Sequence, residues 1–328
     1  MQNPFLESSF TKPDTAFEMP LRPSSLTDFV GQEGVIEKLQ VLIHAAKGRK
    51  EALGHILFSG PPGLGKTTLA NILSKAMGTN LVVTSGPVIE KAGDLAGLLT
   101  GLKEGDVLFI DEIHRMNRSV EEYLYPAMED FKLDLMIDSG PAARSIQVKL
   151  NRFTLAAATT RLGQISSPLR SRFQINLKLD YYPLKELVEI LERTSRILNL
   201  DITTKALEII GARSRGTPRI ANNLLKWVRD YAYVRFNGKV DEACVIKALD
   251  LLEIDGKGLD QTDKRILRIL IDHHKGGPTG VATIAASVGE EVSTIEEVHE
   301  PYLIMQGFLK RTPRGREVTD LAYKHMRE

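Results

Sequence analysis

The segment Gly60-Pro-Pro-Gly-Leu-Gly-Lys-Thr67 constrains this chain more than any other. An apolar run from His55 to Ser59 precedes it, and a helical pattern from Thr68 to Met77 follows it. Glycines at this spacing let backbone N–H groups surround phosphate oxygens, while the lysine adds positive charge and the threonine hydroxyl can hold Mg²⁺. The segment therefore predicts a phosphate-binding loop for a nucleoside triphosphate, with ATP expected. The candidate nucleotide contacts are Gly60, Gly63, Leu64, Gly65, Lys66, Thr67 and Thr68.

A second apolar run, Val107 to Ile110, ends in the adjacent carboxylates Asp111 and Glu112. Neighbouring side chains on a strand point in opposite directions, so the two carboxylates are expected to divide their work. We expect Asp111 and Thr67 to bind Mg²⁺, and Glu112 to polarise a water for attack on the γ-phosphate. The alternative is a solvated strand end. His114 is expected to be a local hydrogen-bonding residue and not a metal ligand.

Strand and helix patterns alternate through the first half of the chain, which predicts an α/β domain with a parallel sheet covered by helices. The expected strands are 55–59, 81–85, 107–111, 154–158 and 175–179, with helices that include 68–77 and 119–128. One β-hairpin interrupts this pattern: 133–138 and 145–150 flank Ser139-Gly-Pro-Ala-Ala-Arg144.

From Pro183 the apolar residues recur at helical spacing, and Thr217-Pro218 is typical of a helix start. A Gly256-Lys-Gly258 linker leads to expected helices at 263–272, 281–288 and 294–306, then to two strands in 307–318 around a Thr-Pro-Arg-Gly turn. This order predicts a winged helix. The expected organisation is a flexible arm at 1–20, a large domain at 21–182, a small helical domain at 183–253 and a winged-helix domain at 254–328.

The basic residues balance the acidic ones, 43 against 42, so any nucleic-acid contact must come from a local patch. Such a patch lies on the expected wing, with Glu317 as its only acid; its cations are Lys310, Arg311, Arg314 and Arg316. Four cations within seven residues suit backbone phosphates and carry little sequence information, although charge runs are often merely solvated. The helix pattern beside them favours contact with DNA.

Cys244 is the one cysteine, which excludes an internal disulfide and a four-thiolate zinc site. We expect Cys244 to be a core residue, and His273-His274 to be a polar helix end. The chain shows no membrane-spanning apolar run and no secretory signal pattern, so a cytoplasmic location is expected.

The chain resembles the AAA+ ATPases and, more narrowly, the RuvB family of branch-migration motors. The resemblance runs from about residue 21 to 322, and its densest segments besides the phosphate loop and Asp111-Glu-Ile-His114 are 21–23, 28–32, 84–94, 122–131, 140–145, 167–173, 216–222, 300–304 and 306–316. It implies the AAA+ P-loop domain, the small helical lid domain and the C-terminal winged helix in one chain.

The resemblance also implies residue roles. Leu21, Arg22 and Tyr182 would line the base and sugar pocket, and Glu129, Asp130 and Phe131 would add nucleotide contacts. Thr160 would position the attacking water, and Arg219 would be a second sensor on the lid. Arg172 would be an arginine finger that reaches a neighbouring subunit's γ-phosphate, with Arg170 as the alternative. The family often has a basic residue near position 292, where this chain has Val292, so DNA contact is expected mainly from Arg311 and Arg316.

The implied activity is ATP-driven pumping of duplex DNA at Holliday junctions in recombination, DNA repair and the SOS response. The implied partners are RuvA, docked on the hairpin at 133–150, the nuclease RuvC and further copies of the chain in a hexameric ring. Alternatively, the apolar hairpin residues Leu133, Leu135, Met136 and Ile137 would pack on their own domain. Other readings of the whole chain are a clamp-loader-type AAA+ switch, a DNA-binding module that only senses nucleotide, and a protein unfoldase. The wing argues against the clamp loader, and the complete catalytic set argues against a module that only senses nucleotide. The lack of a pore-loop pattern argues against the unfoldase.

Overall fold

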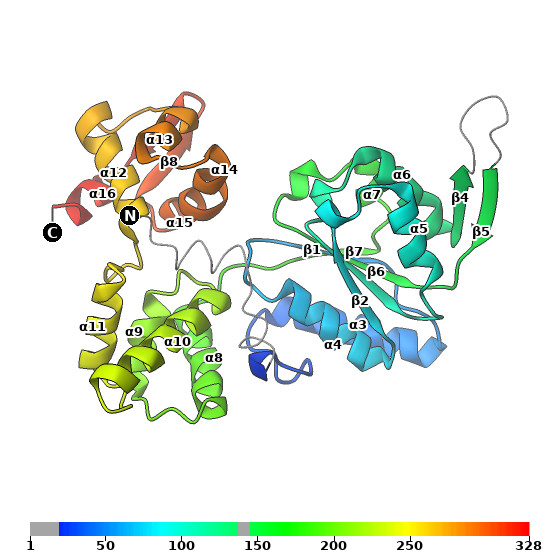
Figure 1. The fold of residues 1–328 in the computed structure, drawn as a ribbon, viewed down its shortest axis with the longest axis horizontal. Coiled ribbons are helices and arrows are strands. Elements are labelled where there is room, and N and C mark those ends of the chain that lie inside the picture. Colours follow the sequence, from blue (N-terminus) through cyan, green and yellow to red (C-terminus); the bar gives the residue numbers. More distant parts are fainter. Residues whose placement is uncertain (1–19, 137–144, 328) are drawn as a thin grey trace. The chain divides into compact units, whose positions relative to one another are not determined.

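The computed structural model describes residues 20–136 and 145–327. The chain divides between Tyr182 and Pro183 into two compact units, which we take in turn (Figure 1). The expected N-terminal arm and the hairpin turn at Ser139–Arg144 lie outside the described residues.

Within the described part of the first unit, five parallel strands form one sheet in the order β2-β3-β6-β1-β7. Their bounds are β1 Ile56–Ser59, β2 Leu81–Ser85, β3 Val107–Asp111, β6 Thr154–Thr159 and β7 Ile175–Lys178. The strands predicted from sequence are confirmed to within one residue at each end. The strands at the centre of the sheet are fully buried, as expected of a parallel sheet with helices on both faces.

The covering helices are α3 Glu33–Arg49, α4 Lys66–Met77, α5 Ala92–Thr100, α6 Arg118–Glu129 and α7 Ser167–Arg170. Helices α3 and α4 lie on one side of the sheet, and α5 to α7 lie on the other (Figure 1). On the second side Leu57, Ile110 and Ala157 of the sheet pack against Leu95, Val120 and Leu169 of the helices. Strands β3, β6 and β1 are neighbours, so their carboxyl ends meet at one edge.

The predicted hairpin is present as β4 Lys132–Met136 paired antiparallel with β5 Ser145–Lys149. Leu133 pairs with Val148 and is fully buried in the core of the first unit. The expectation that the hairpin's apolar residues could pack on their own domain is therefore correct for Leu133. Ile146 on the other strand has 48% of its surface exposed and remains available to a partner.

The second unit begins with the helices of the small domain: α8 Leu184–Ile197, α9 Thr204–Ala212, α10 Pro218–Arg235 and α11 Glu242–Leu251. Leu191, Ile210 and Leu224 are buried where these helices meet. Cys244 is fully buried in α11, and burial raises the pKa of its thiol, which confirms it as a core residue.

The C-terminal part of this unit is the predicted winged helix. Its helices are α12 Gln261–His274, α13 Val281–Val288 and a third made of α14 Val292–Thr294, a π-helical turn Ile295–His299 and α15 Glu300–Met305, followed by strands β8 Leu309–Thr312 and β9 Gly315–Val318 and helix α16 Asp320–His325. The widened turn precedes Pro301, because a proline within a helix has no N–H and its ring crowds the carbonyl one turn earlier. His273 and His274 lie in the last turn of α12, as expected of a polar helix end. No described helix is long and apolar enough to cross a membrane.

Candidate nucleotide site and basic wing

The phosphate loop follows directly from the end of β1 and runs into α4. Gly60, Gly63 and Gly65 have φ values of 133°, 77° and 104°, a backbone region that glycine alone adopts without strain. A Cβ at Gly60 would lie 2.3 Å from the carbonyl oxygen of Leu179, and one at Gly65 would lie 2.9 Å from the Phe29 ring. These glycines are therefore required by both backbone conformation and close packing.

The loop presents positive charge at its centre. Lys66 is 7% exposed, and its Nζ donates to the carbonyl oxygens of Gly60 at 2.8 Å and Pro61 at 2.7 Å. Helix α4 starts at Lys66, so its first N–H groups and the positive end of its dipole face the loop. This combination of ammonium, backbone donors and dipole fits a polyphosphate. Leu64 is fully buried, which leaves only its backbone for a phosphate contact.

Asp111 and Glu112 lie at the carboxyl end of β3, on the same edge of the sheet as the loop. Asp111 Oδ1 accepts a 2.9 Å hydrogen bond from the backbone N–H of Glu112. Glu112 has φ 47° and ψ 45°, a left-handed conformation that a non-glycine residue holds at a cost of about 1–3 kcal/mol and that is concentrated at functional sites. Its Oε2 lies 2.9 Å from Arg115 NH1 on a partly exposed surface. The carboxylate is thus accessible from the loop edge.

The end of β6 completes this edge. His114 Nδ1 lies 3.0 Å from Thr159 Oγ1, which also accepts from the backbone N–H of Arg161 at 3.0 Å. His114 is therefore a local hydrogen-bonding residue, as predicted. The hydroxyl oxygen of Thr160 is buried and has no hydrogen-bond partner among the residues described. An unsatisfied hydroxyl beside the loop fits a residue that binds a water or a phosphate oxygen.

The flank of the loop involves two contacts that the sequence did not reveal. The Gln32 side chain pairs with the backbone of Asp180, donating to its carbonyl at 2.6 Å and accepting from its N–H at 3.2 Å. The Phe29 ring packs on Gly65. Tyr182, which follows Asp180 by two residues, donates from its hydroxyl to the Leu64 carbonyl oxygen at 3.2 Å. Leu21 is buried in this unit and Arg22 is partly buried, so the implied base and sugar contacts share the loop's unit.

Arg172 lies at the opposite edge of the sheet. Arg172 comes three residues before the start of β7. Strand β7 runs parallel to β1, with Ile175 opposite Ile56, so Arg172 lies beside the start of β1. The phosphate loop, in contrast, follows the last residue of β1. The Arg172 guanidinium lies 4.5 Å from the Tyr125 ring centroid, 3.2 Å from Glu129 and 2.6 Å from the Pro168 carbonyl oxygen. The four residues of β1 separate Arg172 from its own phosphate loop by about 13 Å or more.

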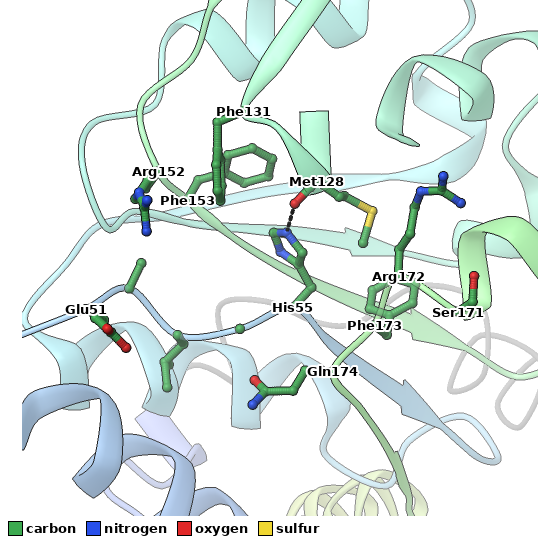
Figure 2. Close-up of a pocket in the computed structure, with 13 residues that line it drawn as sticks. Glu51, His55, Met128, Phe131, Arg152, Phe153, Ser171, Arg172, Phe173 and Gln174 are labelled. Atoms are coloured by element: carbon green, nitrogen blue, oxygen red, sulfur yellow. Dashed lines mark hydrogen bonds between the residues drawn. The ribbon is translucent and has the colours of Figure 1, made fainter. Parts of the chain in front are cut away.

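Glu129, Asp130 and Phe131 lie at this same edge, where a cavity of about 420 Å³ opens (Figure 2). The Phe131 ring is 6.3 Å from the His55 ring and 5.8 Å from the Phe153 ring, so its side chain packs inward. The structure therefore separates the predicted nucleotide contacts into a loop group and an Arg172 group. Arg170 is exposed at the end of α7.

Arg219 belongs to the second unit, in the first turn of α10, where Thr217 precedes and Pro218 opens the helix. It is partly buried. Because Pro218 restricts the backbone at the start of α10, the backbone of Arg219 has a defined orientation within the lid.

The wing separates its cations into two kinds. Lys310, Arg311 and Arg314 are exposed, and the Arg311 side chain has 62% of its surface open to solvent. The Arg316 side chain is only 10% exposed, and its NH2 lies 2.8 Å from Glu300 and 3.1 Å from Glu296. Of the two arginines from which DNA contact is mainly expected, Arg311 is exposed, whereas Glu296 and Glu300 on the third helix draw Arg316 inward. Val292 is exposed at the start of that helix.

Three family models match consecutive parts of the chain: the Holliday junction DNA helicase RuvB P-loop domain at residues 21–179, the RuvB AAA lid domain at 182–255 and the RuvB C-terminal winged helix domain at 256–327. The chain belongs to the RuvB family. It therefore has the P-loop ATPase domain, lid and winged helix of that family, and the clamp-loader alternative is not supported.

Among RuvB proteins, the Holliday junction branch migration complex subunit RuvB of Protochlamydia amoebophila is 66% identical over 99% of this chain and 98% of its own length. The subunit of the same name from Parabacteroides distasonis is 57% identical over 94% of this chain and 91% of its own. The solved structure of the Thermotoga maritima RuvB Holliday junction branch migration motor is 52% identical, has a TM-score of 0.86, and covers 94% of this chain and 98% of its own.

Proposed function

We propose that this chain is the ATP-driven motor of a Holliday-junction branch-migration complex, which moves duplex DNA during recombination and repair. The observation that carries the proposal is the shared edge of β1, β3 and β6, where the loop, Glu112 and Thr160 meet in a chain that also carries a winged helix. A motor of this kind works on DNA in the cytoplasm.

The chemistry follows from the residues at that edge. The loop N–H groups and Lys66 bind the phosphates of ATP, and Thr67 and Asp111 offer the hard oxygen ligands that Mg²⁺ prefers. The bound metal would neutralise charge on the phosphate oxygens. Glu112 accepts a proton from the attacking water, and Thr160 orients that water toward the γ-phosphate. Leu21, Arg22 and Tyr182 hold the base and sugar.

The second group of nucleotide contacts acts on a neighbouring copy. Arg172, Glu129, Asp130 and Phe131 lie at the sheet edge opposite the loop, so a head-to-tail neighbour is needed to bring the two groups to one nucleotide. Heterologous contacts of this kind form a ring when the rotation between neighbours closes. A hexamer with Arg172 as the finger in trans, Arg219 as the second sensor on the lid and Arg170 at the surface fits this arrangement.

The exposed wing cations Lys310, Arg311 and Arg314 contact backbone phosphates of the duplex. The hairpin of β4 and β5, with Ile146 exposed, is the docking site for RuvA, and RuvC joins the larger complex.

The deciding experiment is branch migration of a synthetic four-way junction with purified RuvA, Mg²⁺ and ATP. We expect strand separation that requires RuvA and ATP and that is lost in Lys66→Ala. ATP hydrolysis without junction movement, in the presence of RuvA bound to the junction, would contradict the motor and favour a clamp-loader-type switch.

A further inference from the structure

A cluster of buried charged side chains joins the lid to the winged helix within the second unit. Its members are Arg215 at 2% exposure, Asp260 at 3%, Asp263 at 0% and His299 at 2%. None of them belongs to the nucleotide site or to the exposed wing cations. Burying charge is costly unless each group is paired, so this cluster calls for an explanation.

Arg215 is the centre of the cluster. It belongs to the lid, between α9 and α10, whereas the groups that its side chain contacts belong to the linker or the winged helix. Its NH2 contacts Asp263 and lies 3.5 Å from Asp260, its Nε donates to the Gly258 carbonyl at 2.9 Å, and its guanidinium lies 4.7 Å from the Tyr302 ring centroid. Side-chain atoms of Asp260, Asp263 and His299 lie within 4.8 Å of one another, a spacing that a metal could use, but the guanidinium supplies the positive charge there.

The linker itself is tied down. Asp255 Oδ1 accepts from the backbone N–H groups of Lys257 at 2.8 Å and Leu259 at 3.0 Å. A Cβ at Gly258, which has φ 75°, would lie 2.8 Å from the Arg213 carbonyl oxygen of the lid. The linker expected from its glycines is thus a tight turn pressed against the lid.

Tyr302 of the winged helix also contacts this linker turn. Its hydroxyl donates to the Lys257 carbonyl oxygen. Burial raises the pKa of Tyr302 to about 12, so this hydroxyl keeps its proton and remains a donor.

The cluster connects two sites of the proposed motor. On the lid side, the Arg215 carbonyl accepts from the hydroxyl of Thr217, which precedes the helix that carries Arg219. On the other side, Asp263 Oδ1 lies 2.7 Å from Nδ1 of His299. The next residue, Glu300, holds Arg316 of the wing at 2.8 Å. An unbroken series of contacts therefore runs from the start of α10 to β9.

We propose that Arg215 is a positioning residue that locks the winged helix to the lid, so that a rotation of the lid carries the DNA-contacting wing with it. The lock consists of Arg215, Asp260, Asp263, His299 and Tyr302. One hydrogen bond, two ion pairs and a ring contact meet at this guanidinium and fix its orientation as well as its distance, which a lysine or an apolar contact would not do. The inference rests on the proposed DNA contact of the wing.

The first test measures the lock without DNA. Spin labels at Glu208→Cys on α9 and Arg268→Cys on α12, both exposed positions, are placed in a Cys244→Ala background, and their separation is measured by pulsed electron paramagnetic resonance. We expect one narrow distance that is the same with ADP and with a non-hydrolysable ATP analogue, and a broadened distribution in Arg215→Met. A parent distance that changes with the nucleotide, or an Arg215→Met distribution as narrow as the parent's, would overturn the lock.

The second test measures coupling. Arg215→Met is expected to keep duplex affinity and basal ATP hydrolysis while the stimulation of hydrolysis by duplex DNA falls about tenfold. Arg215→Lys restores charge but not the planar fork and should recover only part of the stimulation. Arg229→Met, which removes a partly exposed arginine of the same lid, is the matched control. Full DNA stimulation in a folded Arg215→Met protein would overturn the proposal.

Removal of one partner could unfold the domain, so two further variants complete the test. Arg215→Met with Asp263→Asn leaves no unpaired charge between the two, and Tyr302→Phe keeps the ring under the guanidinium but loses the hydroxyl. Both should retain duplex affinity and lose part of the stimulation. Arg311→Ala separates a failure of the wing assignment from a failure of the lock: unchanged duplex affinity in this variant would contradict the wing assignment, while its label distances should equal those of the parent.

Discussion

Glu112 combines backbone strain with a proposed catalytic role. Its left-handed backbone follows directly on the end of β3, where Glu112 caps the one-turn helix Ile113–Arg115 and its carbonyl accepts from the Arg115 N–H at 2.9 Å. Strain of this kind persists where the surrounding structure imposes it and the site uses it. The position, and not only the residue type, is therefore part of the proposed general base.

We predict that Glu112→Gln binds ATP with near-normal affinity and loses hydrolysis by about 10²- to 10⁴-fold, because the amide cannot accept the water's proton. Equilibrium binding of a fluorescent ATP analogue and steady-state phosphate release measure the two effects separately. Glu122→Gln, at an exposed position of the nearby α6, is the matched control. Turnover in Glu112→Gln close to that of the control would refute the assignment.

His55 gives the first unit a pH-dependent stability. Burial lowers its pKa from the ordinary 6.5, while a 3.0 Å contact to the Met128 carbonyl oxygen opposes that shift. Nδ1 accepts from the Leu155 N–H at 2.8 Å, an interaction that protonation would abolish. Because the unfolded chain then binds the proton more readily than the folded one, stability is complete above the unfolded pKa and falls as the pH drops below it.

We therefore predict that the free energy of unfolding of the parent falls between pH 7.5 and 5.5 more steeply than that of His55→Gln. Urea unfolding at several pH values gives the comparison, and His44→Gln, at an exposed position of α3, controls for loss of an imidazole as such. Parallel profiles for the parent and His55→Gln would show that the ring does not resist protonation.

At the scale of elements, the sequence pattern predicted the bounds of those strands and helices whose residues are chosen by local burial. The strands β2 and β3 have the predicted bounds. Strand β3 is buried and therefore reads as a continuous apolar run between polar turns, whereas β2 lies at the edge of the sheet and is only partly buried. Helix α13 also has its predicted bounds. Helix α4 begins at Lys66, two residues before the predicted start. Lys66 and Thr67 are polar residues of the phosphate loop, so they do not show the apolar spacing from which a helix is predicted.

Pairings between distant residues could not be predicted in this way. Gln32 and Asp180 meet across 148 residues, and nothing in either segment specifies the other. Arg172 and the loop occupy opposite edges because β1 and β7 are parallel neighbours, which only the strand order reveals. The wing's four cations look alike in sequence, yet Glu296 and Glu300 on another element bury Arg316 and leave Arg311 exposed.

The two arginines of the wing should therefore respond differently. Arg311→Ala is expected to change stability by less than about 0.5 kcal/mol, to weaken duplex binding and to reduce the salt slope of the affinity by about 1. Arg316→Ala leaves Glu300, at 3% exposure, without its buried partner, and should cost about 3–5 kcal/mol of stability.

Chemical unfolding and duplex binding from low to high salt distinguish these outcomes. Lys324→Ala, at an exposed position of α16, is the control for loss of a cation outside the wing. A stable Arg316→Ala protein with a reduced salt slope would show that Arg316 contacts DNA directly, as the sequence alone suggests.

At the scale of the whole molecule, the opposite-edge placement of Arg172 means that, in the proposed mechanism, one subunit alone does not complete the catalytic site. The loop edge supplies Lys66 and Glu112, and the other edge supplies Arg172 beside Tyr125 and Glu129. In that mechanism, a subunit without its finger should still bind ATP, and a subunit without its loop lysine should still offer its finger to a neighbour. This division leads to a complementation test.

We predict that Arg172→Ala and Lys66→Ala proteins hydrolyse ATP poorly when alone and recover part of the activity when mixed, because some neighbours then pair an intact loop with an intact finger. Phosphate release is measured across mixing ratios, and native mass spectrometry of differently tagged subunits establishes that mixed rings form. The control replaces Arg172→Ala with Arg172→Ala/Glu112→Gln, which has neither a finger to give nor a base to use. Mixed rings that show no more hydrolysis than this control would place the action of Arg172 within its own subunit.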